Sequence, residues 1–131
     1  MTSRKYDTGL AIRHDMFGAE VTDRQIREAS PFLRAMQDMV TENCFGEVWS
    51  RPGLDRKTRS MLTIAMLIGL GRSHELRIHV KGALSNGVTE TELSELLRHA
   101  AVYCGVPASV DAFINTDAAL REAAAASPAR G

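Results

Sequence analysis

The sequence predicts an all-α fold, a compact bundle of about six helices that assembles into an oligomer. Apolar residues recur at helical spacing in several segments, and no segment alternates as a half-buried strand would. Helix start and stop residues separate these segments. Aromatic residues make up only 5% of the chain against 44% hydrophobic, so Leu, Ile, Val, Met and Ala must fill the core. A length of 131 residues suits one domain, spanning 1–131.

The first third of the chain contains two helix start signals. Met1 to Gly18 show no firm period, so we expect residues 1–20 to form an arm that packs against something else. Thr22 to Gln25 have the spacing of a capping box and predict the start of the first helix. Ser30-Pro31 predicts the second start, with Ser as N-cap and Pro in the first turn. That second helix should stop before Gly46.

A connector and a central helix follow. Phe45 to Gly53 hold Gly, Pro and the single Trp of the chain, and predict the connector. Asp55 can cap the next helix, residues 56–70, which is apolar nearly all round and should therefore be central. Gly69 and Gly71 are expected to end it.

Three more helices are predicted after this point. Ser73 can cap the first of them, which should run to Asn86-Gly87. Thr89 to Glu92 form another capping box and open the next helix. Gly105 and Pro107 break the chain, so the last helix should cover about Ala108 to Ala119. The Ala-rich tail, residues 121–131, is expected to fray.

Composition excludes several classes of function. The chain has 16 basic and 16 acidic residues and no basic run, which argues against nucleic-acid binding. Its polar start lacks the apolar stretch of a signal peptide, and its most apolar segment, Met61 to Leu70, is too short to cross a bilayer. We therefore expect a cytoplasmic protein without a membrane partner. Cys44 and Cys104 form neither a CxxC motif nor a zinc spacing.

The clearest chemical pattern is the pair Glu75 and His79. Four residues apart on a helix, they lie on one face, one turn apart. A carboxylate there can orient the imidazole and favour its charged form, which makes the pair a proton-transfer unit. The plainer interpretation, a surface ion pair or a satisfied half-buried histidine, is the commoner one for this spacing alone.

Metal and nucleotide sites do not fit these motifs. His74, Glu75 and His79 resemble an H-E-x-x-H zinc motif but are spaced one residue too far. The two histidines would lie roughly 140° apart around the helix. Gly69-Leu70-Gly71 follows a helix rather than a strand, so it is no dinucleotide loop. We expect no cofactor and no metal.

Arginines suited to gripping carboxylates surround the two central helices. They are Arg51, Arg56, Arg59, Arg72 and Arg77. Most should be ordinary solvated surface, but Arg72 lies one turn before Glu75 on the same face. Trp49 could either cap a pocket or anchor the connector.

Four motifs together resemble the carboxymuconolactone decarboxylase family, over about Tyr6 to Leu120. They are the Trp49 connector, the HELRIH helix at 74–79, the Asn86-Gly87 stop and the turn at 103–107. The wider superfamily includes peroxidase-type disulfide reductases, whose CxxC ends four residues before a histidine. Matching that histidine to His79 puts Arg72 and Glu75 at the cysteine positions, and the upstream glutamate of those enzymes falls near Ser60. The resemblance therefore favours the decarboxylase branch over thiol chemistry.

The resemblance implies a reaction and a set of roles. A cofactor-free enzyme of aromatic catabolism, the β-ketoadipate pathway, would convert 4-carboxymuconolactone, a small anionic lactone, to the 3-oxoadipate enol-lactone. His79 would transfer the proton, oriented by Glu75, while Arg72, Arg59 and Trp49 would bind substrate. Two alternatives stay open: a thiol-dependent peroxidase of the same superfamily, and a non-catalytic helical assembly module.

The resemblance also implies a homo-oligomer, since such proteins form closed rings, often hexamers. The arm carries Leu10, Ile12, Met16 and Phe17, which a neighbouring subunit could bury. The roles of His14 and His74 stay open at this stage.

Overall fold

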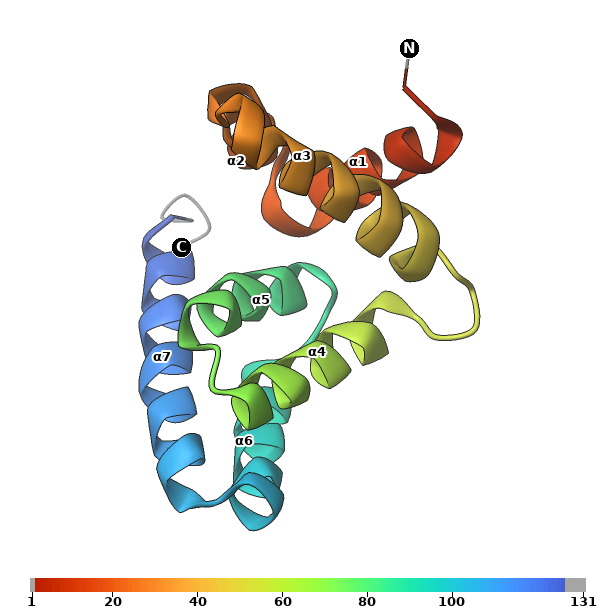
Figure 1. The fold of residues 1–131 in the computed structure, drawn as a ribbon. Coiled ribbons are helices and arrows are strands. Elements are labelled where there is room, and N and C mark those ends of the chain that lie inside the picture. The colour runs from red at the N-terminus through yellow and green to blue at the C-terminus, as the bar shows by residue number, and fades with distance from the viewer. Residues whose placement is uncertain (1, 127–131) are drawn as a thin grey trace. The chain divides into compact units, whose positions relative to one another are not determined.

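A computed structural model describes residues 2–126, and every regular element in that range is a helix (Figure 1). The all-α prediction is therefore confirmed. The chain divides into two compact units, residues 1–56 and 57–131. About six helices were expected; the described range holds seven α-helices and one π-helix. They are α1 (Arg4–Phe17), α2 (Ala19–Glu28), α3 (Pro31–Met39), the π-helix η1 (Val40–Trp49), α4 (Arg56–Leu70), α5 (Ser73–Ser85), α6 (Glu90–Cys104) and α7 (Val106–Ala125).

The segment expected to be an irregular arm is helix α1. Ser3 caps it by accepting a hydrogen bond from the backbone N–H of Tyr6, and Gly18, at φ +94°, ends it. The four buried positions of α1 do follow a helical period. Two of them are not large apolar residues, so the hydrophobic pattern of the sequence did not predict the helix. The four are Gly9, Ile12, Arg13 and Met16.

Helix α1 packs on η1 with backbone nearly touching backbone. A Cβ atom on Gly9 would lie 1.8 Å from the carbonyl oxygen of Thr41, and one on Gly46 would lie 2.0 Å from that of Lys5. Ile12 and Met16 pack beside this contact against Phe45, forming the apolar core of the first unit. Ile12 and Met16, two of the apolar residues of the expected arm, are therefore buried within their own unit.

Two helix boundaries in the first unit differ from expectation. Thr22 is not a cap: it lies inside α2, 1% exposed, and its hydroxyl donates to the carbonyl of Arg13 at 3.4 Å. Ser30 does cap α3, with Pro31 in the first turn, as predicted. The helical segment that begins at Pro31 does not end before Gly46, because α3 continues directly into η1 as far as Trp49. The connector is therefore shorter than expected, and its first half is helical.

In the second unit, α4 buries one stripe rather than its whole surface. Ser60, Ile64 and Ile68 are at most 3% exposed, at the four-residue spacing of one helix face. Met66 and Leu70, in contrast, are 62% and 71% exposed. The stripe contributes to a core shared with α5, α6 and α7. The helix begins directly after Asp55, as expected, and runs through Gly69 before ending at Leu70.

The remaining boundaries were predicted in part. Asn86 and Gly87, the latter at φ +91°, end α5, and the Thr89 capping box opens α6, both as expected. Ser73 is not the cap of α5, since Arg72 occupies that position and the Ser73 hydroxyl donates to Asp111.

Helix α7 is longer at both ends than predicted. It starts at Val106 because a proline is tolerated in the first helical turn. It extends through Ala125, so the first part of the expected frayed tail is helical. The rest of that tail, 127–131, lies outside the described residues.

Candidate active site

Helix α5 carries the Glu75–His79 pair, and one of its flanks is tied to α7. Arg77 and Lys81 both reach Glu122, each at 2.5 Å. The buried face between the flanks contains Leu76 and Val80, which are 2% and 0% exposed. The buried face and the ion-paired flank show which way α5 is turned.

The opposite flank of α5 carries the predicted site. At about 100° per residue, Glu75 and Asn86 both lie within about 40° of His79, whereas Arg77 and Lys81 lie roughly 160° away. At the C-terminal end of this flank, the Asn86 amide donates a 2.9 Å hydrogen bond to the hydroxyl of Ser60 on α4. The candidate site therefore lies on the flank turned away from α7, and its C-terminal end contacts α4.

His79 is largely buried, and its electrostatics follow from that burial. Burial lowers the pKa of the imidazole from its ordinary value, and the charge of Glu75 raises it by a smaller amount. Glu75 thus favours the charged form, as expected from the sequence, but the desolvation effect is larger. The neutral imidazole is the resting form near pH 7.

The predicted arginines differ in their surroundings. Arg72 is exposed and forms the N-cap position of α5, one turn before Glu75. Arg59 is half-buried on α4, directly before Ser60. Arg56 pairs with Asp15 at 3.0 Å and is an ordinary surface arginine.

Trp49 belongs to the first unit, where it packs. Its ring lies 5.5 Å from that of Phe45, and it contacts the core cluster that contains Ile12 and Met16. This arrangement supports the anchoring interpretation of Trp49. The structure brings Arg72, Glu75 and His79 together on α5, while Trp49 contributes to a different core.

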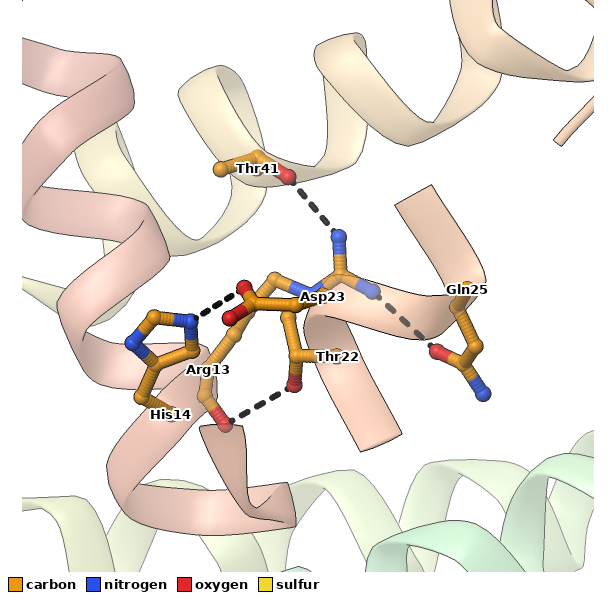
Figure 2. Close-up of polar contacts among 6 residues, drawn as sticks. All are labelled: Arg13, His14, Thr22, Asp23, Gln25 and Thr41. Atoms are coloured by element: carbon orange, nitrogen blue, oxygen red, sulfur yellow. Dashed lines mark hydrogen bonds and ion pairs between the residues drawn. The ribbon is translucent and has the colours of Figure 1, made fainter. Parts of the chain in front are cut away.

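The sequence did not reveal the polar cluster around Arg13 in the first unit (Figure 2). The Arg13 guanidinium donates to Thr41 at 2.8 Å and to Gln25 at 3.4 Å. His14, whose role was open, pairs with Asp23 at 2.7 Å. The signal that could have placed Arg13 inward was its register with Gly9, Ile12 and Met16 on α1, described above.

A groove of about 470 Å³ between α4 and α6 is separate from the predicted residues. It is lined by Met61, Ala65, Leu96, His99, Ala100, Tyr103 and Cys104.

Cys104 and Cys44, which is distant in sequence, are exposed free thiols. Among the described residues, no three His, Cys, Asp or Glu side chains are arranged to hold a metal ion. No helix in the same range is long and apolar enough to cross a membrane.

A part-buried imidazole beside a carboxylate in an all-helical fold is a candidate site for acid–base chemistry. The chain belongs to the carboxymuconolactone decarboxylase family, whose model matches residues 34–126. It is 45% identical over 119 residues to a nitrosuccinic acid decarboxylase of Metarhizium robertsii, covering 91% of this chain and 83% of the relative. It is 43% identical over 106 residues to a 4-carboxymuconolactone decarboxylase of Acinetobacter baylyi, covering 81% and 79%. The protein is accordingly an enzyme of a decarboxylase family.

Proposed function

We propose that this enzyme decarboxylates 4-carboxymuconolactone to the 3-oxoadipate enol-lactone, without a cofactor, in aromatic catabolism. The observation that carries the proposal is the relative of that name, 43% identical over 81% of this chain. The part-buried His79 supports it, because the reaction needs a proton donor at carbon.

The substrate explains why the protein needs to supply little besides charge and a proton. When CO2 leaves the ring carbon, the electron pair of the broken C–C bond moves through the ring double bond into the lactone carbonyl. The product of this step is a dienolate. One proton then adds to the carbon next to the carbonyl, so each turnover releases one CO2 and consumes one proton.

His79 is our candidate for the proton-transfer residue. A dianionic substrate close to the imidazole would raise its pKa, opposing the effect of burial. The imidazolium formed in this way can give its proton to the dienolate, and Glu75 orients the ring and stabilises its charge. A positioned acid of this kind is typically worth ~10²–10⁴-fold in rate.

The carboxylates of the substrate need cationic partners. We assign this role to Arg72, which is exposed at the start of α5, and to Arg59 on α4. A guanidinium suits a carboxylate because its planar fork donates two parallel hydrogen bonds. Trp49 stays a proposed substrate contact, with its packing role as the competing interpretation.

A second candidate substrate is nitrosuccinic acid, favoured by the 45% identity of that relative over 91% of this chain. It is also a small dicarboxylate, and its nitro group can accept the electron pair left by CO2. The resulting nitronate would again be protonated at carbon. The same residues would therefore hold the same roles, and only the fit of the substrate would differ.

We also propose that the enzyme is a cytoplasmic homo-oligomer, a closed ring such as a hexamer. Large apolar side chains on α4, α6 and α7 are mostly exposed, and apolar surface of this kind, where it is contiguous, suits a contact between subunits. They include Met66, Leu70, Val102, Tyr103, Val106 and Ile114. Sedimentation of the purified protein tests this: a hexameric species supports it, and a monomer that is fully active contradicts it.

The test of function is direct. Purified enzyme is mixed with each substrate, with no additives, and ultraviolet absorbance and CO2 release are followed. Turnover of the lactone supports the first proposal, and turnover of nitrosuccinate alone replaces it with the second. Turnover of neither substrate by a folded protein contradicts both and favours a non-catalytic module. Peroxide reduction that requires Cys44 or Cys104 would instead favour the thiol-dependent alternative.

A further inference from the structure

We propose that Asn86 is a positioning residue for His79, acting through its hydrogen bond to Ser60. The bond holds the C-terminal half of α5 against α4, and so sets where the imidazole lies relative to the residues of α4. The inference rests on the proposed role of His79, but its main test does not require catalysis.

The first step of the argument is helical register. Asn86 follows His79 by seven residues, or about two turns, and therefore lies almost directly in line with it along α5. The Asn86 amide reaches α4 at 2.9 Å from the Ser60 hydroxyl. A contact in line with His79 limits rotation of α5 about its own axis, which is the motion that would move the imidazole most.

The second step is burial of the acceptor. Ser60 is 0% exposed, so its hydroxyl depends on partners within the protein. The ion pairs on the other flank, from Arg77 and Lys81 to Glu122, join side chains that are all more than a third exposed. Such exposed pairs are screened by water and restrain geometry weakly. The bond to Ser60, whose acceptor is fully buried, is therefore the more rigid restraint.

The third step is that the Asn86 side chain is not needed to end the helix. The Asn86 backbone N–H donates to the carbonyls of Gly82 and Ala83, at 3.0 and 3.1 Å. Gly87, at φ +91°, then turns the chain out of the helix. The amide contact with α4 is therefore additional to the cap, and removing it should leave the end of α5 in place.

The fourth step connects position to chemistry. His79 owes its lowered pKa mainly to burial, with Glu75 acting in the opposite direction. If α5 turns or loosens against α4, water reaches the ring and its pKa moves back toward the ordinary value near ~6.5. The titration of His79 thus reports its position.

The experiment compares Asn86→Ala with Asn115→Ala, a matched control whose amide bonds to Asp111 within α7. The His79 ring signals are assigned by their loss in His79→Gln and titrated by NMR. We expect the pKa of His79 to rise in Asn86→Ala, and kcat to fall roughly tenfold with KM nearly unchanged. Asn115→Ala should match the wild type in both measurements.

Two further variants keep the test decisive. Asn86→Ser retains a residue suited to a helix end but is too short to reach Ser60, and it replaces Asn86→Ala if that variant unfolds. Ser60→Ala removes the other partner. If the bond is the cause, the double variant Ser60→Ala/Asn86→Ala should lose little more than either single variant, because both remove one interaction.

The outcomes are distinct. An unchanged His79 titration in a folded Asn86→Ala protein overturns the proposal, as do losses that add independently in the double variant. If the wild type turns over neither substrate, the proposed function fails, and the titration still decides whether Asn86 positions His79.

Discussion

The guanidinium of Arg13 donates a 2.8 Å hydrogen bond to the hydroxyl of Thr41, joining α1 to η1 inside the first unit. Arg13 is only 6% exposed, and its other hydrogen-bond partner is the neutral amide of Gln25. Within residues 2–126, no carboxylate forms an ion pair with it. Burial accordingly lowers the pKa of the guanidinium, with a smaller opposing effect from Tyr6. The first unit therefore contains a buried charge balanced only by neutral groups.

The buried charge of Arg13, which has no carboxylate partner, predicts the effect of Arg13→Met. Methionine keeps much of the apolar volume and removes the desolvated charge, so the free energy of unfolding should fall less than in Arg13→Ala, or not at all. Arg13→Ala, the control, leaves a cavity and should lower it by about 2–5 kcal/mol. Urea unfolding measures both. A loss in Arg13→Met as large as in Arg13→Ala would show that the charge itself is stabilising.

His79 and Glu75 should differ in their effect on turnover. Replacing His79 with Ala removes the proposed proton donor and should lower kcat by ~10²–10⁴-fold. Replacing Glu75 with Gln keeps the shape of the side chain and removes only its charge, so the loss should be smaller. Steady-state kinetics on the substrate that the enzyme accepts measures both, with circular dichroism to confirm folding. Near-normal kcat in folded His79→Ala would remove the imidazole from the mechanism.

The lowered pKa of His79 also predicts a dependence of stability on pH. The unfolded chain binds a proton at the ordinary pKa near ~6.5, while the folded protein resists it until lower pH. The contribution of this histidine to stability is therefore unfavourable at low pH and disappears as pH rises above ~6.5. Between pH 5 and 8, His79→Gln should show a smaller rise in unfolding free energy than the wild type. Equal slopes for the two proteins would mean that His79 titrates alike in both states.

The contact between α1 and η1 predicts a contrast between two glycine substitutions. A Cβ at position 9 would collide with the carbonyl of Thr41, whereas one at position 53 meets nothing within 4 Å. Gly9→Ala should therefore lower the free energy of unfolding by at least the ~1–3 kcal/mol typical of an overpacked core, because the new Cβ would meet backbone atoms that cannot easily move. Gly53→Ala should be nearly neutral. Thermal unfolding of the two variants checks the contrast, and similar midpoints would mean that α1 can move aside at little cost.

The features that the sequence predicted are those encoded within a few residues. The Thr89 capping box and the Asn86-Gly87 stop depend on local hydrogen bonds, and both are confirmed. The shared flank of Glu75 and His79 is local in the same sense, because once α5 exists its period places both residues on one side.

The features it missed depend on distant parts of the chain. Gly9 and Arg13 disguise the buried face of α1, because their reasons for facing inward are Gly46 and Thr41, more than 25 positions away. The bond from Asn86 to Ser60 joins residues 26 apart, and no spacing rule predicts it. No local sequence pattern predicts that α3 continues as the π-helix η1.

The wide turns of η1 have a consequence for changes in the length of the chain. In η1 each backbone bond spans five residues instead of four, so the segment holds more chain per turn than an α-helix would. A gene that lost one codon here would still encode a continuous helix, with the wider turns closing to the tighter pattern. Because the tightened turn takes up the missing residue, the positions after it keep nearly the same angular phase, whereas in a uniform α-helix the same loss would shift them by about 100°. A one-residue deletion in η1 should therefore disturb the residues from that point to the loop before α4 less than it would in an α-helix.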